Sequence, residues 1–203
     1  MTPRHVIFGT GPIGRATAVA LLKRGESVRM VNRSGRAVLD GVETAAGDAR
    51  DPEFTRAVAS GAAVIYQTLN PEYHEWHVEF PKLQAGVLAA AESSGALYVN
   101  MDNVYSYGKP DGKTLTEASP NNPVARKGKL RQTMADELWA AHAAGRVRVT
   151  SGRASDYFGP GGGDASPLGD RVFPQAIAGK NVQVFGKPDL LHSFTFIPDI
   201  GMD

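Results

Sequence analysis

Short apolar runs alternate along this chain with longer segments in which apolar residues recur every three or four positions. The first apolar run, 6–8, is followed by a glycine-containing turn and then by 13–21, where the apolar side chains have helical spacing. Gly25 ends that segment, and 27–31 is again apolar enough for a buried strand. The pattern predicts a strand, a tight turn, a helix and a second strand.

The same alternation continues to Thr150. Pro81 interrupts one of the helical segments early, and Gly145 ends the last of them. Strands that alternate with helices favour a parallel sheet covered on both faces, so we expect an α/β fold with a Rossmann-type, doubly wound parallel sheet. The further strands are expected at 43–46, 62–69, 96–102 and 147–150, and the further helices at 52–60, 72–94 and 124–144. After a glycine-rich loop at 157–163, we expect a short helix at 168–178 and strands at 182–185 and 191–197.

The first turn carries the spacing of a dinucleotide-binding site. Its three glycines would serve a tight turn, close approach of a diphosphate and close packing of the helix on the strand. The free N–H groups at the helix N-terminus would then hold the diphosphate, although a simple strand-to-helix turn can match the same spacing. We therefore expect cofactor contacts from Gly9, Thr10, Gly11, Pro12, Ile13 and Gly14.

The end of the second strand bears on the choice of nucleotide. An NAD site usually has an acidic residue there for the ribose hydroxyls, whereas the extra phosphate of NADP requires positive charge and neutral donors. This chain has Asn32, Arg33, Ser34 and Arg36. We expect NADP as the cofactor, with NAD as the second choice, and the alternative is an ordinary polar loop with two solvated arginines.

Two further positions lie where the adenine and the cofactor crevice are expected. Asp48 follows the predicted strand at 43–46 and could accept a hydrogen bond from the adenine amino group. Asp48 could equally begin a turn that leads to Asp51-Pro52 at the start of the next helix. Leu69 ends the strand at 62–69, on the ligand-binding edge of the sheet.

The composition narrows the classes of function. The chain has 203 residues and a formal net charge of +1, so we expect neither a nucleic-acid partner nor a membrane, although 126–131 is locally basic. There are no cysteines, which excludes disulfides and thiolate sites and favours the cytoplasm. His74 and His77 are three residues apart without a third ligand nearby, so we expect no metal. A small-molecule substrate is the expected partner.

Several ordered motifs give the chain a resemblance to a known family. They are Tyr107-Gly108, Thr116-Glu117, the prolines of 120–123, Arg153 with 157–161, and 194–200. With the glycine turn, these motifs resemble an extended, atypical short-chain dehydrogenase/reductase of the NAD-dependent epimerase/dehydratase type. The resemblance implies an NAD(P)-binding Rossmann domain in 1–152 and a substrate-binding region in 153–203. It also implies an oxidoreductase or epimerase that acts on a small carbonyl or hydroxyl compound.

The chain departs from that family at the catalytic positions. Matching Lys129 to the family's lysine puts Ala125 where the catalytic tyrosine is expected, and Asn103 falls on the usual Ser or Thr. We therefore expect a rearranged acid–base set of Tyr105, Asn103, Lys127 and Lys129, in which a lysine assists a tyrosine. The alternative, from another class, is a catalytically idle NADP-binding sensor or regulatory protein.

The final residues depart from the resemblance as well. Extended members continue past the motif at 194–200 into a longer substrate domain, whereas this sequence stops at Asp203. We therefore expect a truncated substrate region. Its exposed apolar surface would favour a homodimer.

Overall fold

The computed structural model of the protein describes residues 4–163, 166–184, 186, 187 and 189–202. Six parallel strands form the central sheet in the order β3-β2-β1-β4-β5-β6. The strand order reverses between β1 and β4, which makes the carboxyl ends of these two strands the expected ligand crevice. The bounds are β1 His5–Phe8, β2 Val28–Asn32, β3 Glu43–Ala46, β4 Val64–Gln67, β5 Leu97–Asn103 and β6 Arg148–Ala154.

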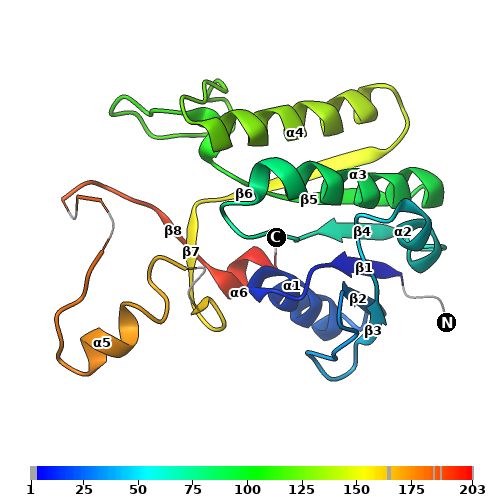
Figure 1. The fold of residues 1–203 in the computed structure, drawn as a ribbon, viewed down its shortest axis with the longest axis horizontal. Coiled ribbons are helices and arrows are strands. Elements are labelled where there is room, and N and C mark those ends of the chain that lie inside the picture. Colours follow the sequence, from blue (N-terminus) through cyan, green and yellow to red (C-terminus); the bar gives the residue numbers. More distant parts are fainter. Residues whose placement is uncertain (1–3, 164–165, 185, 188, 203) are drawn as a thin grey trace.

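Helices cover both faces of the sheet (Figure 1). Side chains alternate across β1, so Ile7 packs with Ala18 and Leu21 of the helix α1, while Val6 and Phe8 belong to the larger core on the other face. That larger core includes apolar residues of the helices α3 and α4. The bounds are α1 Pro12–Lys23, α2 Pro52–Val58, α3 Trp76–Ser94 and α4 Arg126–Ala143, with a 3₁₀ turn η1 at Tyr105–Tyr107. The predicted Rossmann-type, doubly wound sheet is confirmed.

Local signals place most elements correctly. The third strand, 43–46, is where it was expected, and Asp51 caps α2 by accepting hydrogen bonds from the backbone N–H groups of Glu53 and Phe54. Other bounds differ: the strand expected at 62–69 covers 64–67, and the helix expected at 72–94 begins at Trp76. α3 continues through Pro81 rather than being interrupted there, and β6 continues to Ala154 because its last residues pair with Met101–Asn103 of β5.

The residues after β6 form a second, smaller arrangement. Strands β7, Asp156–Phe158, and β8, Phe194–Phe196, pair in parallel, and the short helices are α5, Phe173–Ile177, and α6, Ile197–Ile200. α6 lies against α1 (Figure 1), and a Cβ on Gly201 would lie 2.5 Å from the backbone of Ala16. The predicted helix at 168–178 and strand at 191–197 are therefore shorter than expected. The strand expected at 182–185 is absent from 182–184, and Phe185 lies outside the described residues.

Within the described part of the chain, none of the helices combines the length and the apolar character needed to cross a membrane.

Candidate cofactor and substrate site

The glycine turn after β1 is held against the start of the loop after β4. Gly9 has φ +113°, a conformation that L side chains rarely adopt, and a Cβ there would lie 2.7 Å from the Thr68 hydroxyl oxygen. The Thr68 hydroxyl donates to the carbonyl oxygen of Phe8 at 3.0 Å. The turn is thus located between β1 and β4, at the point where the strand order reverses.

The other two glycines of the turn have different surroundings. A Cβ on Gly14 would lie 2.3 Å from the Gly9 carbonyl oxygen, so α1 packs directly on the turn. A Cβ on Gly11 would meet nothing within 4 Å. Gly11 is the N-cap of α1 and provides no side-chain cap, and the first turn of this fully described helix has no acidic residue. The helix N-terminus therefore faces open space and can accept an anion.

Arg15 follows this turn directly, and a role for it was not predicted from the sequence. Its guanidinium is exposed, and its Nε donates to the carbonyl oxygen of Thr10 at 2.9 Å. This contact holds a positive charge beside the glycine turn. The position of Arg15 directly after Gly14 could have indicated a place beside the cofactor turn.

A pocket of about 190 Å³ lies beyond the ends of β2, β3 and β4. Four of the predicted cofactor residues line it together, namely Asn32, Arg33, Asp48 and Leu69. The structure therefore brings together residues that are up to 37 positions apart in the sequence, as expected for the carboxyl edge of a parallel sheet. The α3 side of the pocket carries Glu72, Glu75 and Glu79.

The loop after β2 is closed by its own polar side chains. The Asn32 amide nitrogen donates to the Arg36 carbonyl oxygen at 3.0 Å, and the Ser34 hydroxyl donates to the Asn32 amide oxygen at 3.0 Å. These bonds fix the loop that presents Arg33. Among the described residues, the exposed Arg33 guanidinium makes no hydrogen bond or salt bridge, although its charge helps to lower the pKa of Asp48.

Asp48 begins a turn and also lines the pocket. Its carboxylate accepts from the backbone N–H of Arg50 at 2.9 Å and from the Arg50 side chain, which also reaches Glu79 at 2.7 Å. The hydrogen bonds from the Arg50 side chain are the main cause of the lowered pKa of Asp48. The position of Asp48 therefore fits both the turn and the adenine contact. Its carboxylate, however, already accepts hydrogen bonds from Arg50. Arg50 was not selected from the sequence.

A cluster of aromatic rings lies against Tyr105, just after the carboxyl end of β5. The centres of the Tyr105 and Trp76 rings lie 5.9 Å apart. The Trp76 and Tyr73 rings meet edge to face, with 5.1 Å between their centres. The pKa of Tyr105 is raised by burial, by a hydrogen bond with Tyr73 and by the negative charge of Asp156. Tyr105 therefore stays protonated at neutral pH. Its phenol is suited to donating a hydrogen bond.

The two candidate lysines differ in position. The ammonium of Lys127 lies 3.6 Å above the centre of the Tyr73 ring and 5.9 Å from that of Trp76, so it joins the aromatic cluster. Lys129 is exposed on α4. Asn103 ends β5, and its side-chain oxygen accepts from the Tyr105 backbone N–H at 3.0 Å, which fixes the start of η1. The structure thus places Asn103, Tyr105 and Lys127 around one region and leaves Lys129 apart.

A buried ion cluster lies beneath this region. The Asp102 carboxylate pairs with Arg131 of α4 and with Arg153 of β6, where the Arg153 Nε to Oδ2 distance is 3.3 Å. Arg131 also lies over the ring of Phe80, 4.6 Å from its centre. Arg131 was not predicted from the sequence. Its position could have indicated a buried charge, because Arg131 lies three residues before Met134 and seven before Leu138, on the apolar stripe of the helix.

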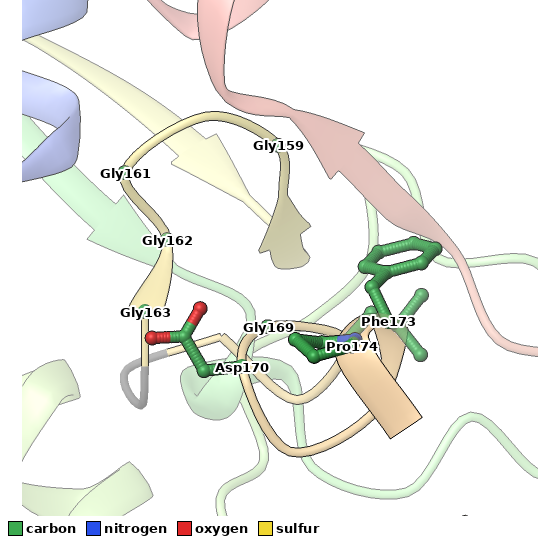
Figure 2. A pocket seen from close by; sticks show the side chains of 9 residues that line it. Gly159, Gly161, Gly162, Gly163, Gly169, Asp170, Phe173 and Pro174 are labelled. Carbon is green, nitrogen blue, oxygen red and sulfur yellow. The ribbon is translucent and has the colours of Figure 1, made fainter. Parts of the chain in front are cut away.

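A second pocket of about 280 Å³ lies away from the sheet, in the segment that follows β7. Figure 2 shows the backbone at Gly161, Gly162 and Gly163 on one side and Asp170, Phe173 and Pro174 on the other. None of the predicted site residues lines it.

Comparison with known proteins agrees with the fold. The model of the NAD dependent epimerase/dehydratase family matches residues 6–201 of the chain. No curated protein matches the chain in sequence.

Several solved structures share the fold. UDP-N-acetylglucosamine 4-epimerase from Bacillus cereus superposes with a TM-score of 0.84 at 14% identity, over 97% of this chain and 68% of that chain. MoeE5, solved with UDP-glucose and NAD, superposes with a TM-score of 0.79 at 19% identity, over 97% of this chain and 69% of that chain. UDP-glucose 4-epimerase from Thermus thermophilus, solved with NAD, superposes with a TM-score of 0.77 at 19% identity, over 98% of this chain and 72% of that chain.

Proposed function

The chain belongs to the NAD dependent epimerase/dehydratase family, and from that premise we propose that it binds NADP and catalyses oxidoreduction or epimerisation of a small hydroxyl or carbonyl compound. The single observation that carries the cofactor proposal is the open, uncapped N-terminus of α1 at Gly11. A diphosphate has the charge and the size to use those N–H groups. When bound, the nicotinamide ring supplies an acceptor or donor of hydride.

The rest of the nucleotide would be held by the pocket at the ends of β2 to β4. Asn32 replaces the acidic side chain that would repel a phosphate, and Arg33 lines the pocket with an unpaired charge among the described residues. Ser34 and Arg36 hold the loop in shape, and Arg36 is exposed beside it. These features support NADP over NAD.

The substrate region would lie at the carboxyl ends of β5 and β6. Tyr105 would donate a hydrogen bond to the oxygen of the substrate, Asn103 would hold Tyr105, and Lys127 would contact the rings of Tyr73 and Trp76 beside it. The neighbours solved with UDP-glucose make that sugar nucleotide the first compound to test.

One observation favours the alternative of a catalytically idle NADP-binding sensor. Ala125 is the N-cap of α4 and has no proton to exchange, and Lys129, four residues later, is exposed. A sensor would need the cofactor pocket but no acid–base group.

Two measurements separate the proposals. Calorimetric titration with NADP⁺ and NAD⁺ tests the cofactor, and equal affinity for both would remove the NADP assignment. Spectroscopic assay of NADPH with UDP-glucose, sugar nucleotides, aldehydes and ketones tests the chemistry. Turnover of any of these compounds supports the enzyme, whereas tight NADP⁺ binding without turnover supports the sensor.

We also propose that a second copy of the chain covers the apolar side chains exposed after β7. Ile177 is 85% exposed and Leu191 is completely exposed. Light scattering should give the mass of a dimer for the wild type and that of a monomer for Leu191→Glu. A wild-type monomer would contradict the proposal.

A further inference from the structure

His192 and Asp156 are 36 residues apart in the sequence, and the parallel pairing of β7 with β8 brings them together. Asp156 pairs with Phe194 in that ladder, and His192 precedes Phe194 by two residues. The His192 Nε2 lies 2.9 Å from the Asp156 Oδ2. A side-chain bond between Ser155 and Thr195 at 2.9 Å supports the same ladder.

The His192 ring is held from a second side. It packs against the ring of Phe194 with 4.6 Å between the ring centres. Its side chain is nevertheless 52% exposed, so a ligand can reach it. A partly exposed imidazole that is oriented by a carboxylate has the arrangement of a general base.

Asp156 also connects this pair to the substrate region. β7 follows β6 after Ser155 alone, so Asp156 lies just beyond the carboxyl edge of the sheet. Its carboxylate is close enough to Tyr105 for its negative charge to raise the pKa of that phenol. Asp156 therefore contacts His192 directly and acts electrostatically on Tyr105.

We propose that His192, oriented by Asp156, is the general base of this site, and that Tyr105 is its hydrogen-bond donor. This inference rests on the proposed oxidoreductase function. The Nε2–H group donates to Asp156, which leaves the lone pair of Nδ1 to accept the proton of a substrate hydroxyl group.

The proposed reaction is the oxidation of a secondary alcohol to a carbonyl compound. The hydroxyl proton would move to His192 Nδ1, and the carbinol carbon would lose its hydrogen as hydride, for which a bound oxidised nicotinamide would be the acceptor. The two electrons of the O–H bond become the second bond of the carbonyl group. The alcohol would thus be oxidised, with the two electrons of the hydride passing to the bound nicotinamide. In the reverse direction, His192 returns the proton to the oxygen.

Tyr105 does not fulfil this role by itself. Its neighbours raise its pKa, and no cation is among the groups that act on its titration. A phenol that retains its proton can orient and polarise an oxygen but cannot remove a proton at neutral pH. The site therefore needs a separate base, and an imidazole exchanges protons in that pH range.

The first test is kinetic and uses the full chain with NADP⁺ and the alcohol that the compound panel identifies. His192→Gln should lower kcat by about 10²-fold or more, with the dissociation constant of NADP⁺ unchanged. His77→Gln, an exposed histidine on α3, is the matched control and should keep the wild-type kcat. Added imidazole should raise the turnover of His192→Ala.

Each alternative outcome of this test has a defined meaning. Wild-type turnover by His192→Gln would overturn the proposal. A rise in KM with unchanged kcat would place His192 in substrate binding alone and would also overturn it. No gain from imidazole in His192→Ala would assign the ring a packing role instead.

The second test does not depend on turnover. Nitrogen NMR of the histidine-labelled full chain at about pH 8, where an ordinary imidazole is neutral, reports which ring nitrogen carries the proton. We expect the proton on Nε2 of His192 and a changed tautomer population in Asp156→Asn. A proton on Nδ1 in the wild type would overturn the proposal. Silence of the wild type toward every compound would instead contradict the proposed function, and the tautomer would still report on the pair.

Discussion

The guanidinium of Arg131 pairs with the carboxylate of Asp102 where α4 passes over the end of β5, with 2.9 Å between Nε and Oδ1. Both side chains are almost completely buried, at 3% and 1% exposure. Arg153 adds a second positive charge to the same carboxylate. The cluster therefore joins three elements through one acidic group.

We predict that Asp102→Asn destabilises the protein by about 3–5 kcal/mol, because it leaves two arginines without their buried counter-charge. Chemical denaturation gives the free energy of unfolding. Asp136→Asn, an exposed position on α4, is the control and should change it little. If Asp102→Asn lowered the free energy of unfolding no more than the control does, the cluster would contribute little to stability.

The glycines of the turn should respond differently to the same substitution. Gly11→Ala should leave the thermal midpoint unchanged but weaken NADP⁺ binding by tenfold or more, about 1.4 kcal/mol, because its methyl group enters the open space before α1. Gly14→Ala should lower the midpoint, because its methyl group meets the Gly9 carbonyl oxygen. Calorimetry and thermal unfolding of both variants distinguish the effects, and unchanged binding by Gly11→Ala would contradict the diphosphate assignment.

Arg33→Ala should weaken NADPH binding by roughly 1.5–3 kcal/mol, the value of a charge-assisted hydrogen bond, and leave NADH binding unchanged. Raised salt concentration should reduce the difference between the wild type and the variant. Arg56→Ala, an exposed arginine on α2, controls for the loss of one positive charge. A variant that loses affinity for both cofactors equally would place Arg33 away from the 2′-phosphate.

Tyr105→Phe should lower turnover by about 10²–10⁴-fold, because it keeps the ring against Trp76 but removes the hydrogen-bond donor. Cofactor affinity should stay close to that of the wild type. Asn103→Ala should cost less, since its oxygen contacts the backbone of Tyr105 rather than the substrate. Tyr107→Phe is the control, and equal turnover by the two phenylalanine variants would remove Tyr105 from the proposed site.

His5 gives a prediction for the pH dependence of stability. Burial lowers its pKa in the folded protein below the ordinary value of 6.5, and this effect outweighs the opposing one of Glu26. Below that ordinary value the unfolded chain binds a proton that the folded chain resists. Stability should therefore fall as the pH drops below about 6.5, by at most about 1.4 kcal/mol per pH unit from this group. His5→Gln should show a shallower decline in denaturation experiments between neutral and mildly acidic pH.

The repeated pattern of the first 150 residues was enough to predict the sheet. The glycine turn, the cap at Asp51 and the apolar runs are local signals, and the observed strands agree with them. The extension of β6 to Ala154 was missed because Ser151 to Ala154 lack strand-forming side chains and are held by pairing with β5. Pro81 predicted an interruption from local chemistry, whereas tertiary packing keeps the helix continuous.

The placement of the candidate residues was predictable only where they lie at strand ends. Asn32, Asp48 and Leu69 share a pocket because parallel strands end at one edge. Arg50, Arg131 and Tyr73 have partners that are set by side-chain direction and by contacts between distant elements, which no local pattern records. His192 faces Asp156 only through the β7–β8 ladder, whose register the sequence does not specify.

The contact between α6 and α1 has a consequence for the order in which the chain acquires its structure. The Arg24 guanidinium bonds the carbonyl oxygen of Met202 across 178 residues, and Gly201 lies on the backbone of Ala16. During synthesis at about 5–20 residues per second, α1 therefore exists for some ten seconds or longer before its partner emerges. We expect the sheet to form first and the docking of α6 to be a late folding event.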